Sequence, residues 1–436
     1  MIAEIRASWG RLVSVGLPAV VSQGTNAVWG VVTLLVARVL PEQQYAAFSL
    51  AKTVEILAVT VGGGFVMQAL LKYASEGSGR RAETVNSAAA LALALTLGGA
   101  GLLIACGGLI QSFYSGIPLG GLPAVLSLMV LSEGICAVPR NNLLAVQKTR
   151  QVMWGDLAGF ATRMSIVLYL ALSGRLSSPH PIFMAQAVSN VVCLLVLARG
   201  GGRFFERGAG VARESLARVW RFSVYTLGTS LAAYIYSWTD ILMLGRMAPG
   251  DVATYGVARS LTMFVASLNQ AANIVLLPLA SRMHTTGRTP GVAARTWQGI
   301  ILVEAIQLPV IAVFAIFPRQ ILDILFEGRY SDGWAVVMVL ALLNLFKPVG
   351  SLFSSTACGL GKPEYSLRSV LISALLNVGL NALLIPRIGG LGAAIATVFS
   401  VISGGTAIWI AVSSYLRKLS DDPGVVEPAE PGREGE

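Results

Sequence analysis

The sequence predicts an all-α polytopic membrane protein of about twelve transmembrane helices, arranged in two six-helix lobes related by a parallel internal repeat. Of the 436 residues, 55% are hydrophobic and 12% are charged, whereas about 25% of residues are charged in soluble domains. The mean hydropathy of +0.70 agrees with a membrane protein. Apolar stretches of about 20 residues, long enough to cross the hydrocarbon core as a helix, recur along the whole chain.

The predicted spans follow one another with short connections. They cover residues 12–38, 45–71, 84–110, 122–146, 153–173, 181–198, 220–245, 253–280, 298–317, 333–357, 366–385 and 391–415. The first stretch is too long for a signal-peptide core and lacks a cleavage site, so we expect it to remain as a helix. No connection between spans is long enough to fold into a catalytic domain, so the sequence predicts no enzyme.

The formal net charge of +10 reflects membrane topology rather than nucleic-acid binding. Most of the 32 Lys and Arg residues fall in predicted loops on one side of the membrane. Because cytoplasmic loops carry the excess of Lys and Arg, both termini are predicted to be cytoplasmic. The longest connection, residues 199–219, is a basic loop on that side, and the Pro- and Glu-rich tail at 417–436 is predicted to be disordered.

The two halves of the chain resemble one another, as in many transporters. Residues 38–54 align with residues 246–261, so that Arg38 matches Arg246, Pro41 matches Pro249 and Lys52 matches Arg259. Each half contains an even number of predicted helices, which makes the repeats parallel, with an axis along the membrane normal. We therefore predict an N-terminal lobe at 1–198, a linker at 199–219 and a C-terminal lobe at 220–416, with alternating access through a cleft between the lobes.

Three segments carry a family resemblance that extends over nearly the whole chain. They are L-P-E-Q-Q-Y-A-A-F-S-L-A at 40–51, I-L-D-I-L-F-E-G-R-Y at 321–330, and the stretch at 361–397 that contains N-V-G-L-N-A-L-L-I-P-R-I-G-G-L-G-A-A-I-A-T. The chain thereby resembles the polysaccharide transporter family, the O-antigen and oligosaccharide flippases of the multidrug/oligosaccharidyl-lipid/polysaccharide (MOP) superfamily. The resemblance implies a fold like that of the multidrug and toxin extrusion (MATE) transporters.

The resemblance also implies a substrate, a location and partners. Members flip polyprenyl-diphosphate-linked oligosaccharides across the bacterial inner membrane for O-antigen, capsule or exopolysaccharide assembly, and work with glycosyltransferases and polymerases of the same pathway. Lipid II flippases of the superfamily usually have two further helices, which this chain lacks, so a peptidoglycan precursor is a poorer candidate. The expected partners are thus the lipid-linked glycan and membrane lipids, and no cofactor is expected.

Two cations on repeat-equivalent helices are the sharpest site prediction. Lys52 on the second span and Arg259 on the eighth could hold a diphosphate between the lobes, because cations in a low-dielectric cleft attract phosphate strongly. Lipid II flippases use basic residues on the matching helices, so the resemblance supports this assignment. The structural alternative is that Lys52 pairs with Glu55, one turn away, and that Arg259 extends to the outer surface.

Other polar residues within the spans could bind phosphate or sugar, or could equally hold helices together. Lys347 on the tenth span, beside a kink expected at Pro348, is a third cation. The remaining candidates supply amides and a carboxylate: Gln23, Asn26, Asp240, Asn269 and Asn273. On the eleventh span, Ser369, Ser373, Asn377 and Asn381 recur at every fourth residue, which predicts close helix packing.

Buried charges other than these cations suggest a coupling or structural role. Asp156 and Arg163 share a helix face, so an ion-pair network with Glu133 is one interpretation. The alternative makes Glu133 or Glu304, or the Glu55 carboxylate, a site for a coupling ion, H⁺ or Na⁺. The cysteines Cys106, Cys136, Cys193 and Cys358 fall within spans and are expected to be buried. With two histidines far apart, no metal site is predicted.

Three competing functions remain at the level of sequence: a multidrug exporter, a membrane polymerase or ligase, and an assembly partner that does not itself transport. A multidrug and toxin extrusion type exporter would bind organic cations with acidic groups, for which Glu55, Asp240 and Glu304 are candidates. The matched cations Lys52 and Arg259 favour an anionic substrate instead. A membrane polymerase or ligase of the same pathway usually carries a large periplasmic loop, and the longest outward connection here, near 318–333, is short.

Overall fold

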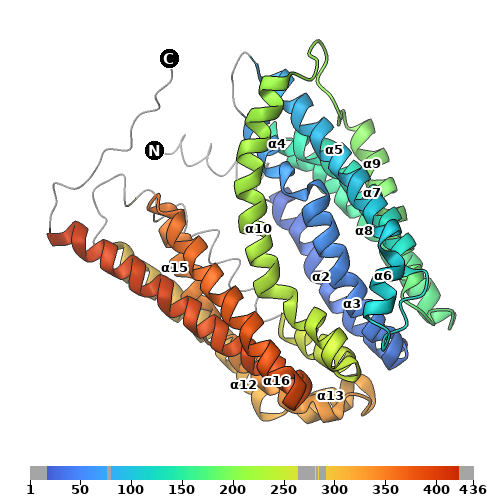
Figure 1. Ribbon diagram of the computed structural model, residues 1–436, viewed down its shortest axis with the longest axis vertical. Coiled ribbons are helices and arrows are strands. Elements are labelled where there is room, and N and C mark those ends of the chain that lie inside the picture. Colours follow the sequence, from blue (N-terminus) through green and yellow to red (C-terminus); the bar gives the residue numbers. More distant parts are fainter. Residues whose placement is uncertain (1–16, 76–79, 264–279, 281–282, 284–290, 422–436) are drawn as a thin grey trace. The chain divides into compact units, whose positions relative to one another are not determined.

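The computed structural model describes residues 17–75, 80–263, 280, 283 and 291–421. This part of the chain forms helices and turns and contains no strand (Figure 1). Eight of its helical segments are long and apolar enough to cross a membrane. The prediction of an all-α polytopic membrane protein is therefore confirmed.

The predicted spans fall on helices wherever the structure describes them. The eight apolar segments and the predicted spans do not correspond one to one, because the segment at Pro363–Lys418 covers the last two spans. The seventh span lies on a helix with many polar residues, and the eighth is described only as far as residue 263. The predicted tail at 417–436 begins within a helix that continues to Asp421, and its remaining residues lie outside the described chain.

By contacts the chain divides into two compact units, residues 1–260 and 261–436. We call them the N-terminal unit and the C-terminal unit. This division differs from the predicted lobes because the helices between residues 213 and 260 pack against the helices between residues 42 and 105, which belong to the N-terminal unit. The repeat-based lobes at 1–198 and 220–416 stay a prediction.

The N-terminal unit is a helical bundle in which α10 packs along α3, α4 and α5 (Figure 1). Its helices are α2 (Leu17–Val39), α3 (Glu42–Val59), α4 (Val66–Ser75), α5 (Arg81–Ala105), α6 (Gly107–Phe113), α7 (Leu122–Ala145), α8 (Thr149–Leu172), α9 (His180–Arg199) and α10 (Arg213–Met247). Small residues allow close packing: Gly159 on α8 accepts a hydrogen bond at its carbonyl from the Ser189 hydroxyl of α9, at 2.8 Å.

The second predicted span is broken into α3 and α4 by a π-helical turn at Thr60–Gly64. Gly63 has a φ of 109°, and a Cβ atom there would lie 2.6 Å from the carbonyl oxygen of Ala92, so the turn requires glycine. The Thr96 hydroxyl donates to the carbonyl of Gly62 at 2.8 Å. The break lets α4 run in a different direction from α3, and the Gly62 carbonyl at the break keeps a hydrogen-bond partner in Thr96.

The connection between α9 and α10 is fastened to the N-terminal bundle. The side-chain amide of Asn86 donates to the carbonyls of Glu206 and Ala209, at 3.0 and 2.8 Å, and its oxygen accepts the Glu206 N–H at 2.7 Å. The Asn142 amide donates to the Arg203 carbonyl at 2.9 Å. Because α10 begins at Arg213, the last residues of the predicted linker are helical.

The C-terminal unit is also helical. Its described helices are α12 (Val292–Ile316), α13 (Pro318–Phe326), α14 (Trp334–Leu343), α15 (Lys347–Gly359) and α16 (Pro363–Asp421). The break between α14 and α15 comes directly before Lys347 and Pro348, as predicted, since proline is favoured at the first helical position.

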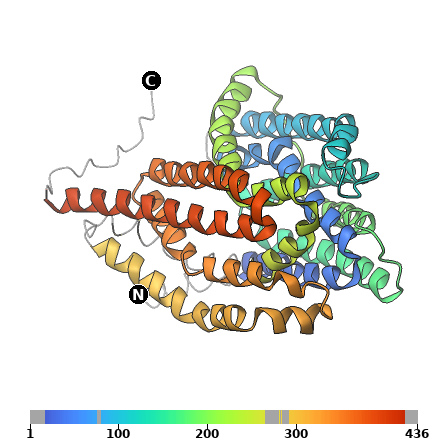
Figure 2. The same ribbon diagram turned by 60° about the horizontal axis from the view of Figure 1, so that its bottom comes forward.

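The helix α16 turns back on itself at Ile388 and Gly389 into two antiparallel halves (Figure 2). Ser369 and Ser373 donate to the carbonyls of Gly404 and Ser400, at 2.8 and 3.0 Å. The predicted packing role of this polar stripe is confirmed, because its hydroxyls join the two halves of the helix.

Candidate functional site

The helix at 252–263 crosses α3 at residues that the internal repeat makes equivalent. A Cβ atom on Gly256 would lie 2.5 Å from Ser49 Oγ, and the Tyr45 hydroxyl lies 3.5 Å from Ser260 Oγ. The alignment that matches Lys52 with Arg259 also matches Ser49 with Gly256. A residue that touches its own repeat mate lies on the pseudo-twofold axis, so this contact, which we call the crossing, marks that axis within the N-terminal unit.

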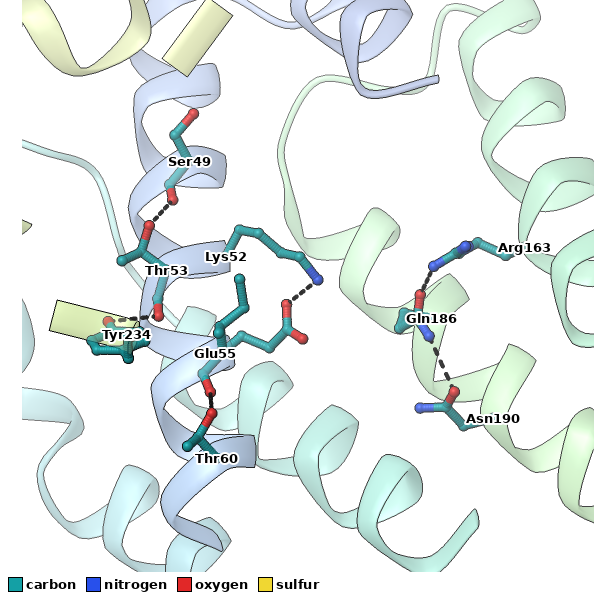
Figure 3. Close-up of polar contacts among 10 residues, drawn as sticks. Ser49, Lys52, Thr53, Glu55, Thr60, Arg163, Gln186, Asn190 and Tyr234 are labelled. Atoms are coloured by element: carbon teal, nitrogen blue, oxygen red, sulfur yellow. Dashed lines mark hydrogen bonds and ion pairs between the residues drawn. The ribbon is translucent and has the colours of Figure 1, made fainter. Parts of the chain in front are cut away.

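Lys52 lies one turn beyond the crossing and is held by a carboxylate of its own helix. Its Nζ atom is 2.5 Å from Glu55 Oε2, and the two side chains are 35% and 5% exposed. Figure 3 shows them pointing toward one another from α3. The structural alternative for Lys52 is thus confirmed for this conformation. The lysine keeps enough exposure to reach a ligand.

Arg259, the repeat mate of Lys52, stacks on an aromatic ring. Its guanidinium carbon lies 4.1 Å from the centre of the Trp238 ring of α10, a cation–π distance. Asp240, two residues further along α10, is fully buried, and its carboxylate accepts a hydrogen bond of 2.6 Å from the Tyr255 hydroxyl. Asp240 therefore joins α10 to the 252–263 helix, and the contact of Arg259 with Trp238 joins the same two helices.

The other predicted charges of the N-terminal unit come together near Lys52. Glu133 on α7 lies within electrostatic reach of Lys52, Glu55 and Arg163. Asp156 forms a bidentate pair with Arg140, with Nε–Oδ1 and Nη2–Oδ2 distances of 3.0 and 2.8 Å. The predicted partner of Asp156 on its own helix was Arg163. We give the name charged cluster to six residues of α3, α7 and α8: the cations Lys52, Arg140 and Arg163 and the carboxylates Glu55, Glu133 and Asp156.

Arg163 connects the charged cluster to a row of polar side chains. Its guanidinium lies 3.7 Å from the centre of the Trp29 ring and donates to the Gln186 side chain. The Gln186 amide donates to Asn190 Oδ1 at 3.1 Å, and Asn190 donates to Ser132 Oγ at 3.2 Å. Figure 3 shows Arg163, Gln186 and Asn190 in line. The sequence reasoning missed this row, although the spacing of Gln186 and Asn190 by four residues on an apolar span was a usable signal.

The remaining predicted site residues lie elsewhere or outside the described side chains. Lys347 begins α15 and Glu304 lies on α12, both half-buried in the C-terminal unit. Gln23 and Asn26 belong to α2, but their side chains lie outside the described residues, as do Asn269 and Asn273 entirely.

In the described chain, no group of three or more His, Cys, Asp or Glu residues could hold a metal ion. The cysteines are free thiols. Cys136 and Cys193 are buried as expected, whereas Cys106 is half-buried and Cys358 is exposed. The exposed position of Cys358 differs from the expectation because the described residues leave its face of α15 uncovered.

A family model described as "Polysaccharide biosynthesis protein" matches residues 35–338. Among curated proteins, the chain is 25% identical over 183 residues to the "Probable low-salt glycan biosynthesis flippase Agl15" of Haloferax volcanii. This match covers 42% of this chain and 39% of that relative, so it spans less than half of either protein.

Solved structures show the fold more completely. The lipid II flippase MurJ, in an inward closed conformation, superposes with a TM-score of 0.73 at 12% identity, over 93% of this chain and 90% of that chain. An inward-facing multidrug resistance MATE family transporter of the MOP superfamily gives a TM-score of 0.71 at 17% identity, over 92% and 96% of the two chains. The predicted MOP fold is confirmed.

Proposed function

The chain belongs to the polysaccharide biosynthesis protein family, and from this premise we propose that it is a flippase for a lipid-linked oligosaccharide. In this proposal the substrate is a polyprenyl-diphosphate-linked glycan, which moves across the bacterial inner membrane by alternating access. The observation that carries the proposal is the crossing, because it places a cation one turn away on each of two repeat-equivalent helices.

The two cations suit a diphosphate in different ways. The ammonium group of Lys52 is a flexible point charge that can exchange Glu55 for a phosphate oxygen. The guanidinium group of Arg259 is planar, lies over the Trp238 ring, and can bind two phosphate oxygens at once. Lys347 is a third candidate from the C-terminal unit. A substrate that binds on the axis can contact both repeats, as alternating access requires.

The polar row at Arg163, Gln186 and Asn190 adds hydrogen-bond donors to the same unit. We include these side chains in the proposed site as sugar or phosphate contacts, and we assign Asp240 a helix-joining role because it is fully buried against Tyr255. The charged cluster would hold the coupling ion, H⁺ or Na⁺, at Glu55 or Glu133, and Glu304 is the corresponding candidate in the C-terminal unit.

Orientation and pathway belong to the same proposal. The arginine-rich side, with both termini, would face the cytoplasm, where glycosyltransferases build the lipid-linked glycan and where the substrate would bind first. A polymerase on the other side would consume it. The protein would therefore act by transport rather than catalysis.

A cation-coupled multidrug exporter is the second candidate, since the MATE transporter shares the fold. Such an exporter needs acidic groups that can reach a cationic drug. Here the Glu55 carboxylate is bound by Lys52, and Asp240 is bound by Tyr255. Both of these acids are engaged in this conformation, which favours the anionic substrate. Glu304 on α12 is the acidic candidate that stays with the exporter alternative.

The decisive experiment deletes the gene and labels lipid-linked glycans on intact spheroplasts with an impermeant reagent. We expect labelling to disappear and to return with the wild-type gene. Lys52→Ala and Arg259→Ala should each fail to restore it while the protein still inserts, and Arg38→Ala serves as a control because it lies outside the proposed site. Normal labelling in the deletion strain, without a redundant flippase, would disprove the function; normal labelling with the double variant would disprove the site.

A further inference from the structure

The junction of α4 and α10 forms an open groove of about 500 Å³ that the proposed function does not use. It is lined by Tyr73, Glu214, Arg218, Arg221, Phe222 and Tyr225, all within the N-terminal unit. The groove lies at the first turns of α10 and the last turns of α4, on the side of the membrane that the sequence predicts to carry most of the arginines.

The groove has a net positive charge and aromatic walls. Arg218 and Arg221 are exposed and lie three residues apart on α10. The Lys72 ammonium lies 4.6 Å from the centre of the Phe222 ring and 5.1 Å from that of Tyr73. The one carboxylate in the lining, Glu214, is 2.7 Å from Arg80 Nη1 and so is matched by a further cation.

The depth of the groove in the membrane follows from the side chains around it. Trp220 and Tyr225 are 47% and 77% exposed, although both are large and aromatic. Trp and Tyr concentrate where the bilayer meets water. From Phe222 to Thr239, α10 contains no charged residue, and it exposes apolar side chains such as Val224 and Ile235. The groove therefore lies at headgroup level, with the apolar part of α10 extending into the hydrocarbon core.

The groove and the candidate site are joined by one helix seam. α10 packs against α4 beside the groove and against α3 beyond it. The Tyr234 hydroxyl of α10 donates to the Thr53 carbonyl of α3 at 3.0 Å, next to Lys52 (Figure 3). Trp238, whose ring contacts the Arg259 guanidinium, lies one turn further along α10. A headgroup bound in the groove would thus lie at the start of the seam that leads to Lys52 and Arg259.

We propose that this groove binds the phosphate headgroup of a lipid in the arginine-rich leaflet, and that its occupant is the isoprenoid diphosphate before it reaches Lys52 and Arg259. The identity of the occupant rests on the proposed function. The chemistry is complementary: Arg218 and Arg221 can bind phosphate oxygens, while Tyr73, Phe222 and Tyr225 border the first isoprene units.

Binding to the purified full-length protein in neutral detergent tests the proposal without requiring transport. The probes are farnesyl diphosphate, a short-chain phosphatidylglycerol, inorganic pyrophosphate and farnesol. An exposed ion pair contributes up to about 1 kcal/mol, so the double variant Arg218→Gln/Arg221→Gln should bind farnesyl diphosphate up to roughly 30-fold more weakly. Arg213→Gln is the matched control, because Arg213 is on the same helix but outside the groove.

Wild-type protein and the control should bind farnesyl diphosphate more tightly than the other three probes. Unchanged binding in the double variant would overturn the site. Equal affinity for phosphatidylglycerol would assign the groove to bulk phospholipid. Equal affinity for pyrophosphate would show that the groove does not recognise the lipid chain. Either result would overturn the loading role. If the groove does not bind the lipid diphosphate, flipping in spheroplasts can still be observed. If the protein does not flip lipid-linked glycans, binding of farnesyl diphosphate in detergent can still be observed.

Discussion

Joining Ser49 to Gly256 by a disulfide should stop transport, because the crossing connects the two repeats, which must move against one another in alternating access. A Cβ atom on Gly256 would lie 3.2 Å from Ser49 Cβ. Disulfides have Cβ–Cβ distances of about 3.5–4.5 Å, so the helices need to separate by only a few tenths of an ångström. An opening of the crossing by several ångströms would break this geometry, and a covalent bond there prevents it.

The variant Ser49→Cys/Gly256→Cys would be oxidised in membranes, and the fraction joined would be measured by intact mass. Replacing the exposed Cys358 with Ser removes the most accessible native thiol. We expect spheroplast labelling to fall in proportion to the joined fraction and to recover with reductant. Each single cysteine variant should be insensitive to the oxidant.

A second disulfide serves as the matched control. A Cβ atom on Gly159 would lie 3.3 Å from the Cβ of native Cys193, so Gly159→Cys can join α8 to α9 within one bundle. That bond links helices that need not separate, and transport should survive it. Full transport by protein joined at the crossing would refute the reasoning, since it would mean that α3 and the 252–263 helix stay together throughout the cycle.

Two further variants test the supporting structure. Asn86→Ala removes three hydrogen bonds to the α9–α10 connection. Because each contributes about 1 kcal/mol, trypsin should cut residues 200–212 of this variant up to a hundredfold faster. Asn142→Ala removes one such bond and should have a smaller effect, and an unchanged cleavage rate in Asn86→Ala would contradict the docking of this connection. Asp156→Asn leaves the half-buried Arg140 without its carboxylate and should lower the unfolding free energy by about 2–3 kcal/mol, seen as a lower melting temperature in detergent, whereas the same change at the exposed Asp332 should have no effect.

The repeat was readable from the sequence because it depends only on residue spacing. Matching Lys52 with Arg259 places Ser49 opposite Gly256, and the structure has those residues in contact. Composition and hydropathy similarly predicted the helical class. The break at Lys347 followed from the proline at the next position.

Side-chain partners on neighbouring helices were not predictable in the same way. Asp156 and Arg163 share a helix face, but seven residues separate them by about 10.5 Å along the axis, too far for a direct ion pair. Arg140 reaches Asp156 from α7 instead. Its proximity depends on how α7 and α8 are rotated against one another, and no pattern within either helix specifies that rotation. The stacking of Arg259 on Trp238 is of the same kind.

The charged cluster gives a physical reason for ion coupling under the proposed function. Its three cations are matched by three carboxylates, so a diphosphate that draws Lys52 away leaves Glu55, which is 5% exposed, without its counter-charge. An uncompensated buried carboxylate costs several kcal/mol. A proton or Na⁺ bound at Glu55 or Glu133 would remove that cost. Substrate and coupling ion would therefore bind together rather than in competition, because the same lysine cannot neutralise both the carboxylate and the diphosphate.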